Sequence, residues 1–219
     1  MTSIPYYEQH AARLIEQYES LGFESVHSEL LEFLPSAPGT ILDVGAGSGR
    51  DASWLASRGH EVIAVEPSRA MRERAKVLHG SPRIHWLDDS LPDLAHVRRL
   101  RLTFDFILLS AVWMHLPPAS RARAMHELAT MLAPGGRIVI TLRLGAPDAE
   151  RHIHAVSQAE LSMLSQQFGL RLIRTTNSDD RLGRAEVTWT TVVLGLPDDG
   201  PGAFPLLRHL TLVDDKAST

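Results

Sequence analysis

The fold of this chain is decided by the stretch Ile41-Leu42-Asp43-Val44-Gly45-Ala46-Gly47-Ser48-Gly49. Residues 40–44 are a short apolar run, typical of a buried strand in a parallel sheet, and residues 51–57 follow with a helical pattern. Glycines between a strand and a helix let the backbone approach a ligand closely, because no Cβ stands in the way. Ligands of open parallel sheets bind at the carboxyl ends of the strands. We therefore predict a ligand-binding loop at residues 43–49.

The spacing of these glycines separates two kinds of ligand. A dinucleotide fingerprint, Gly-x-Gly-x-x-Gly, starting at Gly45 would need a third glycine at position 50. The residue there is Arg50, so the glycine that would accommodate a pyrophosphate is displaced. An NAD(P)-dependent oxidoreductase is therefore the less favoured interpretation.

Strand and helix patterns alternate along the rest of the chain. Strands are predicted at residues 40–44, 61–65, 84–87, 104–109, 138–142, 170–174 and 187–194. Helices are predicted at residues 51–57, 68–78, 118–132 and 157–168. This alternation predicts an α/β fold with a doubly wound, mainly parallel seven-stranded sheet and helices on both faces. No long helix separates the last two strands, so we expect the last strand to be antiparallel.

The chain of 219 residues is long enough for one domain with added segments at its ends. Residues 1–38 have helical patterns on either side of Gly22 and are predicted to form an N-terminal helical cap. Residues 39–196 are predicted to form the ligand-binding domain. Residues 197–219 are predicted to be a C-terminal tail, in which residues 206–212 could form a short helix or an added strand.

Composition excludes several functions. The chain has no cysteine, which rules out disulfides, a thiol nucleophile and cysteine-ligated metal clusters. Its net charge of −4 offers no electrostatic reason to expect binding to nucleic acid or to an anionic membrane. It has no signal-peptide pattern and no run of about 18 apolar residues, so we expect a soluble, cytoplasmic protein.

Acidic residues stand where the next two predicted strands end. Glu66 ends the second strand and could accept hydrogen bonds from both hydroxyls of a ribose. Asp88 and Asp89 end the third strand, where a carboxylate could accept a hydrogen bond from the exocyclic amine of an adenine. We favour Asp88 over Asp89 for this contact. Any one of these acids could be a solvated loop carboxylate, but with Asp43 they form a series at three consecutive strand ends.

Taken together, residues 41–49, 65–68, 88–89, 104–105 and 132–136 resemble the successive motifs of the class I S-adenosylmethionine-dependent methyltransferase superfamily. The resemblance covers about residues 40–142 and implies S-adenosyl-L-methionine as the cofactor, no metal, and transfer of a methyl group to a small molecule. It implies that the cofactor-binding residues are Asp43, Gly45, Ala46, Gly47, Arg50, Glu66, Pro67, Asp88, Asp89, Ser110 and Tyr7. Among these, Arg50 is expected near the cofactor's carboxylate, and Tyr7 belongs to a cap that folds over the cofactor. A domain that binds the cofactor without catalysis and supports a partner is the alternative.

The methyl acceptor is expected over the ends of the fourth and fifth strands. His115 is the candidate catalytic base, with a packing role as the alternative. Trp113 could stack on the adenine or line the acceptor pocket, and core packing is equally compatible with its position. Arg143 could bind an anionic substrate or form a surface ion pair.

Two other substrate or ligand classes are disfavoured near these positions. Residues 110–118 lack the Asn or Asp followed by Pro-Pro and an aromatic residue with which amino-methylating DNA enzymes hold a base, so we expect no nucleic-acid partner. His152 and His154 suggest metal ligands at first sight, but they have no further ligand at a clear spacing, so we expect surface histidines. The oligomeric state stays open.

Overall fold

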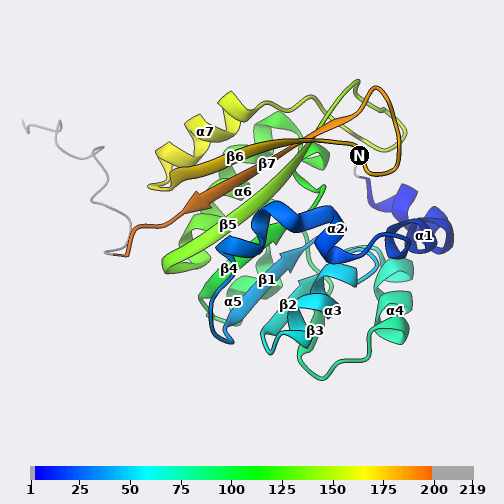
Figure 1. Cartoon of the computed structure of the whole chain (residues 1–219), viewed down its shortest axis with the longest axis horizontal. Coiled ribbons are helices and arrows are strands. Elements are labelled where there is room, and N and C mark those ends of the chain that lie inside the picture. The colour runs from blue at the N-terminus through cyan, green and yellow to red at the C-terminus, as the bar shows by residue number, and fades with distance from the viewer. Residues whose placement is uncertain (1–2, 199–219) are drawn as a thin grey trace, which may run out of the picture.

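The computed structural model describes residues 3–198, and their centre is one seven-stranded sheet in the order β3-β2-β1-β4-β5-β7-β6 (Figure 1). The strands are β1 (Thr40–Val44), β2 (Glu61–Val65), β3 (Ile84–Leu87), β4 (Phe104–Leu109), β5 (Leu132–Leu144), β6 (Arg171–Asp179) and β7 (Thr188–Gly195). Neighbours from β3 to β5 pair in parallel, whereas β7 is antiparallel to both β5 and β6. The predicted sheet and its antiparallel last strand are confirmed.

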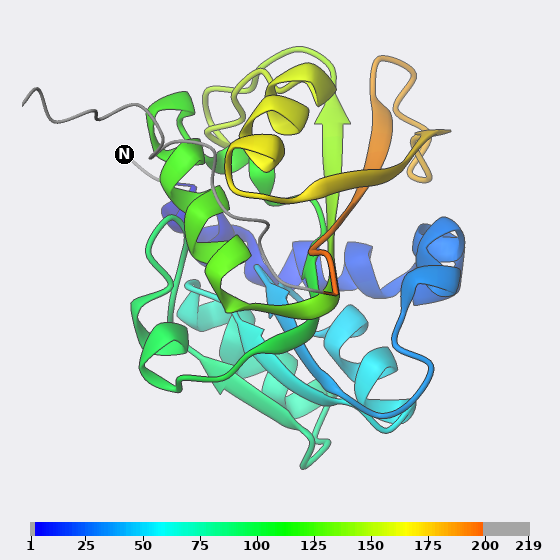
Figure 2. The same cartoon turned by 90° about the vertical axis from the view of Figure 1, so that its left-hand side faces the viewer.

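Helices lie on both faces of this sheet (Figures 1 and 2). They are α1 (Ile4–Glu19), α2 (Phe23–His27), η1 (Ser28–Phe33), α3 (Arg50–Ser57), α4 (Arg69–Leu78), α5 (Ala95–Arg99), η2 (Trp113–His115), α6 (Pro118–Met131) and α7 (Gln158–Gln167). None of the helices within residues 3–198 has the length and apolar character needed to cross a bilayer.

The alternation of side chains along the strands produces two apolar layers. On β4, Ile107 and Leu109 pack in a cluster with α5, α6 and α7, whereas Phe106 and Leu108 pack in a second cluster with α2, η1 and α3. Both layers are fully buried at β4, so this strand lies in the centre of the core. A sheet buried on both faces holds the carboxyl ends of its strands in fixed positions.

The strand order places the glycine loop at the point where the chain reverses direction across the sheet. β1 pairs with β2 on one side and with β4 on the other, so the loop after β1 lies between two diverging connections. Such a switch point forms a crevice at the carboxyl ends of the strands, which is where open α/β sheets bind ligands.

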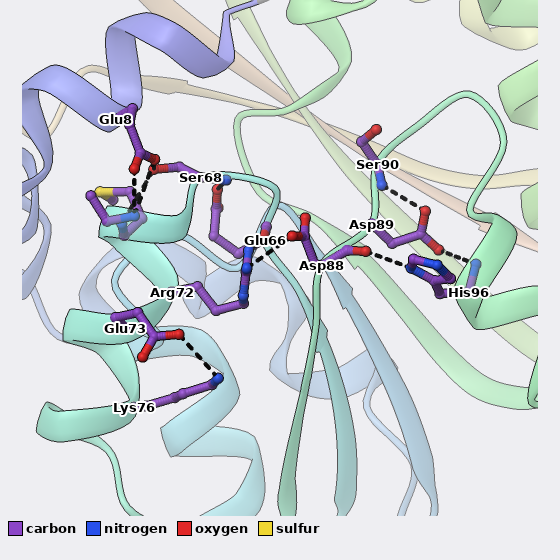
Figure 3. Close-up of polar contacts among 12 residues, drawn as sticks. Glu8, Glu66, Ser68, Arg72, Glu73, Lys76, Asp88, Asp89, Ser90 and His96 are labelled. Atoms are coloured by element: carbon purple, nitrogen blue, oxygen red, sulfur yellow. Dashed lines mark hydrogen bonds and ion pairs between the residues drawn. The ribbon is translucent and has the colours of Figure 1, made fainter.

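The N-terminal helix α1 is fastened beside this crevice. Glu8 accepts hydrogen bonds from Ser68 Oγ at 2.6 Å and from the backbone N–H of Ala70 at 3.1 Å (Figure 3). These bonds join α1 to the start of α4, and Met71 of α4 packs with Leu14 and Ile15 of α1. The division into cap, domain and tail stays a prediction, and residues 199–219 of the predicted tail lie outside the described residues.

Local features differ from the sequence prediction, as in β6, which runs to Asp179, five residues past the predicted end of that strand. β5 begins at Leu132, six residues before the predicted strand, because Leu132 already pairs with Phe104 ahead of a bulge in the ladder. The short helices α5 and η2 were not predicted, because they are too short to show a periodic pattern. At the start of α7, Ser157 accepts from the N–H of Glu160, and the Glu160 carboxylate contacts Arg121.

Arg121 fixes two loops that border the crevice. Its side chain is almost fully buried and donates to the carbonyls of Leu116 at 3.1 Å and Ala155 at 2.9 Å. Its Nη1 pairs with Glu160 Oε2 at 2.5 Å. One buried cation therefore holds together the loop after β4, the loop after β5 and the start of α7.

We predict that Arg121→Met lowers the free energy of unfolding by about 1–3 kcal/mol, because it leaves the buried Leu116 carbonyl without its donor and removes the links to Ala155 and Glu160. The matched control is Arg123→Met on the same helix, where an exposed arginine pairs with Asp93 and the loss should stay below about 1 kcal/mol. Urea denaturation of both variants measures the difference. Equal losses would show that the Arg121 network does not hold the loops.

Candidate active site

A cavity of about 600 Å³ opens at the carboxyl ends of the strands, bordered by the glycine loop, α1 and the loops after β2, β3, β4 and β5. Of the predicted site residues, it is lined by Tyr7, Gly45, Ala46, Gly47, Arg50, Glu66, Pro67, Asp89, Ser110, His115 and Arg143. Asp43, Asp88 and Trp113 do not line it. One continuous space thus joins most of the predicted cofactor residues to two of the predicted acceptor residues.

Gly45 and Gly47 both have left-handed backbone conformations, with φ of +70° and +56°, but for different reasons. A Cβ on Gly45 would lie 2.5 Å from Val112 Cγ2, so the protein's own packing requires glycine there. A Cβ on Gly47 would meet no protein atom closer than 3.8 Å. Gly47, which lines the cavity, is therefore favoured as glycine by its backbone conformation and not by a close protein atom.

Glu66 ties the end of β2 to the glycine loop. Its Oε2 accepts from the backbone N–H of Gly47 at 2.9 Å, and its Oε1 accepts from the N–H of Ser68 at 2.8 Å. Burial raises the pKa of this carboxyl to about 7, although the two N–H donors act in the opposite direction. Each carboxylate oxygen has a second lone pair with which it can accept a bond from a ligand hydroxyl.

A buried charge cluster lies under the glycine loop. Burial, reinforced by the carboxylate of Asp51, raises the pKa of the Asp43 carboxyl well above its usual range. Burial would also raise the pKa of Asp51, but the neighbouring His27 and Arg50 outweigh it and hold that pKa below its usual range. Arg50 Nε donates to Asp51 Oδ1 at 2.7 Å, and His27 Nε2 lies 3.0 Å from Asp51 Oδ2.

The position of Asp43 in this cluster differs from the sequence prediction. The sequence predicted that Asp43 binds the cofactor, but its side chain is almost fully buried and lies outside the cavity. Asp51 lines the cavity instead, at the start of α3. Sequence analysis missed Asp51 and His27 because neither belongs to a motif and their contact spans 24 residues.

The two acids after β3 point in different directions (Figure 3). Asp88 pairs with Arg72 Nη2 at 3.0 Å, and its side chain is 65% exposed outside the cavity. Asp89 lines the cavity, and its Oδ2 accepts from the backbone N–H groups of His96 and Val97 at the start of α5. The preference for Asp88 is therefore not supported by its position, because Arg72 draws that carboxylate away from the cavity.

His115 and Tyr7, which both line the cavity, form a hydrogen-bonded pair. Tyr7 Oη lies 2.9 Å from His115 Nε2, and His115 Nδ1 lies 3.1 Å from the carbonyl oxygen of Arg151. A carbonyl can only accept, so Nδ1 carries the proton and Nε2 accepts from the Tyr7 hydroxyl. Burial, helped by the nearby Arg151 cation, lowers the pKa of His115 to about 4. The ring is therefore neutral near pH 7, and its free nitrogen is already engaged.

Two other predicted residues near η2 have different positions. Trp113 is fully buried in the core cluster of α6 and α7, so core packing explains it and a substrate contact does not. Its position in η2 turns the indole toward the sheet core. Ser110 lines the cavity, and its hydroxyl lies 3.3 Å from His27 Nε2.

Arginines gather in the part of the cavity formed by β5 and by the loops that follow β5 and β6. Arg143 lines the cavity there together with Arg151 and Arg184, which the sequence analysis missed. Arg151 lies in the loop after β5 and Arg184 lies between β6 and β7, so no short-range spacing connects them. Within residues 3–198, no group of three or more His, Asp or Glu side chains is arranged to hold a metal ion.

The glycine loop at the switch point, the strand-end acid and the antiparallel β7 together define a class I methyltransferase fold. Comparison with known proteins agrees, since residues 16–175 match the methyltransferase domain family. The chain belongs to this family, and the predicted class, with S-adenosyl-L-methionine as its cofactor, is confirmed.

Individual relatives show how far the similarity extends. The biotin biosynthesis bifunctional protein BioHC of Cellvibrio japonicus is 28% identical over 81% of this chain and 38% of its own length. An uncharacterized methyltransferase of Oceanobacillus iheyensis is 30% identical over 62% of this chain and 61% of its own length. The chain thus spans less than two thirds of either curated relative.

Solved structures share the fold at low sequence identity. The N-methyltransferase NodS from Bradyrhizobium japonicum, in complex with S-adenosyl-L-homocysteine, matches with a TM-score of 0.66 and 18% identity. This match covers 92% of this chain and 100% of NodS. A SAM-dependent methyltransferase from Methanosarcina mazei matches 80% of this chain and 98% of its own, with a TM-score of 0.63 and 18% identity.

We predict that His115 titrates near pH 4 and stays in the neutral Nδ1–H form at physiological pH. The ring ¹⁵N shifts of histidine-labelled protein report both properties, with Gln substituted at His115 to assign the signals. Tyr7→Phe is the matched control and should move the Nε2 shift while leaving the tautomer unchanged. A midpoint near the ordinary value of about 6.5 would contradict the buried, Arg151-facing environment.

Proposed function

We propose that this chain is an S-adenosylmethionine-dependent methyltransferase that acts on a small molecule in the cytoplasm. The observation that carries the proposal is the single cavity that joins the glycine loop and Glu66 to His115 and Arg143. Its volume of about 600 Å³ lies within the ~300–1,000 Å³ typical of small-molecule sites. A cofactor and a compact acceptor would share this space.

The residues at one end of the cavity fit the cofactor. Gly47 lines the cavity, and Glu66 would accept bonds from the ribose hydroxyls. The loop that begins at Asp89 would border the adenine, and Arg50 would approach the amino-acid carboxylate. Asp43 would influence the cofactor only through the glycine loop, because it lies behind that loop. The helical cap that carries Tyr7 would cover the cofactor.

The bound cofactor would supply a methyl group already activated by a positively charged sulfur. The chain's own residues would align the acceptor with that group and keep water out. The Tyr7 hydroxyl already occupies Nε2 of His115. Tyr7, and not His115, would therefore face the acceptor. A proton leaving the acceptor would move to Tyr7 Oη as the Tyr7 proton moves to His115. The lowered pKa of His115 suits acceptors that need only a weak base.

We predict that binding of S-adenosyl-L-homocysteine weakens about tenfold when the pH falls from about 8 to about 6. The ionised Glu66 accepts from ribose hydroxyls, and its pKa of about 7 means that protonation removes this form within that range. In Glu66→Gln, binding should be weaker by about 1–3 kcal/mol and should lose this pH dependence. Calorimetric titration over the range measures both effects, and the same slope in the variant would refute the ribose role.

The proposed activity is tested by transfer of labelled methyl groups from S-adenosyl-L-methionine to a mixture of metabolites. We expect transfer by the wild type and none by Gly47→Val, in which a β-branched side chain meets a φ of +56° at the cavity wall. Gly80→Val is the matched control, because a Cβ there meets no atom within 4 Å. Binding of S-adenosyl-L-homocysteine without any transfer would favour a non-catalytic domain, and binding of NADH instead would favour an oxidoreductase.

A further inference from the structure

Three arginines come together at the acceptor end of the cavity from separate parts of the chain. Arg143 lies on β5, where it pairs in register with Trp189 of β7. Arg151 lies in the loop after β5, and Arg184 lies in the connection from β6 to β7. All three side chains line the cavity. Like charges repel, so such a group requires either built-in anions or an anionic ligand.

Arg184 has a built-in partner. Its Nε donates to Asp180 Oδ2 at 3.0 Å and its Nη2 donates to Asp180 Oδ1 at 2.5 Å. Trp189 Nε1 donates to the same Oδ1 at 2.9 Å. Two parallel bonds from one guanidinium to one carboxylate satisfy both charges. This pair holds the β6–β7 connection in place and contributes little net charge to the cavity.

Arg143 and Arg151 have no such partner among the described residues. No Asp or Glu oxygen within residues 3–198 lies within 4.0 Å of either guanidinium. The Nε atoms of both are buried without a hydrogen-bond partner in the same range, and Arg143 Nη1 donates only to the carbonyl of Ala146, at 3.1 Å. Asp148 is nearby, but its Oδ1 accepts from the backbone N–H of Arg151. A buried donor without an acceptor costs free energy.

Burial lowers the pKa of Arg143, and the nearby Arg184 and Arg151 act in the same direction, while Asp148 and Asp180 act against them. The pKa of Arg151 is raised, because the neighbouring Tyr7 outweighs the effect of burial. A cofactor with a positively charged sulfur would add another cation to the cavity. An anionic group bound between the arginines would relieve this repulsion and satisfy the buried Nε donors.

We propose that Arg143 and Arg151 bind a carboxylate or phosphate group of the methyl acceptor. This inference rests on the proposed methyltransferase function and names the class of substrate. Guanidinium groups suit both anions, because their donors form a planar fork that matches the oxygens of either.

The cofactor's own carboxylate does not account for these two arginines. Arg50 stands at the glycine loop, next to Asp51 and Tyr18, and would meet that carboxylate there. Arg151 stands beside the Tyr7–His115 pair, because its backbone carbonyl accepts from His115 Nδ1. The two arginines therefore border the part of the cavity where the acceptor would meet Tyr7.

The test titrates protein saturated with S-adenosyl-L-homocysteine with three probes of similar shape: benzoate, phenyl phosphate and neutral benzamide. We expect at least one anion to bind at least about tenfold more tightly than benzamide. Benzoate and phenyl phosphate form separate arms, so their relative affinities show whether the site prefers a carboxylate or a phosphate. Equal affinity for all three probes, or no binding of either anion in millimolar titrations, would overturn the proposal.

Variants assign the binding to the two arginines. Arg143→Gln and Arg151→Gln should each weaken the preferred anion about tenfold or more and leave benzamide unchanged. Arg123→Gln removes the same charge from an exposed arginine outside the cavity and should change nothing. Arg143→Lys and Arg151→Lys keep the charge without the planar fork and should give intermediate losses, so they report on the site if a glutamine variant fails to fold.

Binding of S-adenosyl-L-homocysteine separates this inference from the proposed function. If the wild type does not bind it, the proposed function fails. If the wild type binds it but the arginine variants lose it together with the anion, the two arginines serve the cofactor and the inference fails. Unchanged cofactor affinity with a lost preference for anions is the expected result.

Discussion

The hydrogen bond from the N–H of Gly47 to the carboxylate of Glu66 is the interaction on which the rest of the site depends. It joins the loop after β1 to the end of β2, next to a second link in which Ala46 donates to the carbonyl of Val65. The bond holds a buried carboxyl at the cavity wall and fixes the loop in a conformation open to a ligand. Without it, Glu66 would be a buried acid with fewer donors, and its pKa would rise further.

The part of the cavity around His115, Arg143 and Arg151 depends on a different constraint, because no short motif builds it. Arg121 fixes the loops after β4 and β5 from the core side, and the Asp180–Arg184 pair fixes the β6–β7 connection. These contacts hold the loops that carry His115, Arg151 and Arg184, whereas Arg143 is held by strand pairing on β5. In the proposed function, the rigid part of the site would contact the cofactor and the part assembled mainly from loops would face the acceptor, as expected where substrate choice resides in loops on a common scaffold.

The sequence predicted the strands well and the side-chain directions less well. β1, β2 and β4 begin and end where the apolar runs do, because each is buried on both faces and its pattern reflects burial alone. The bounds of β3 also match, although this edge strand leaves His85 exposed. The directions of the Asp88 and Asp89 side chains could not be predicted in this way. Adjacent residues point to opposite sides of a strand end. Arg72 on α4, 16 residues away along the chain, pairs with Asp88 and holds that carboxylate away from the cavity.

The sequence by itself determined the sheet, the glycine loop and the acids at the strand ends, because all of these follow from local patterns within a few residues. Only the tertiary structure decided that Trp113 belongs to the core, that Asp43 lies behind the loop and that His115 is engaged by Tyr7 from a helix 108 residues away. It also brought Arg151 and Arg184 to Arg143. Burial, hydrogen bonding and charge repulsion act between residues that are close in space, and strand order across the sheet determines which distant residues meet.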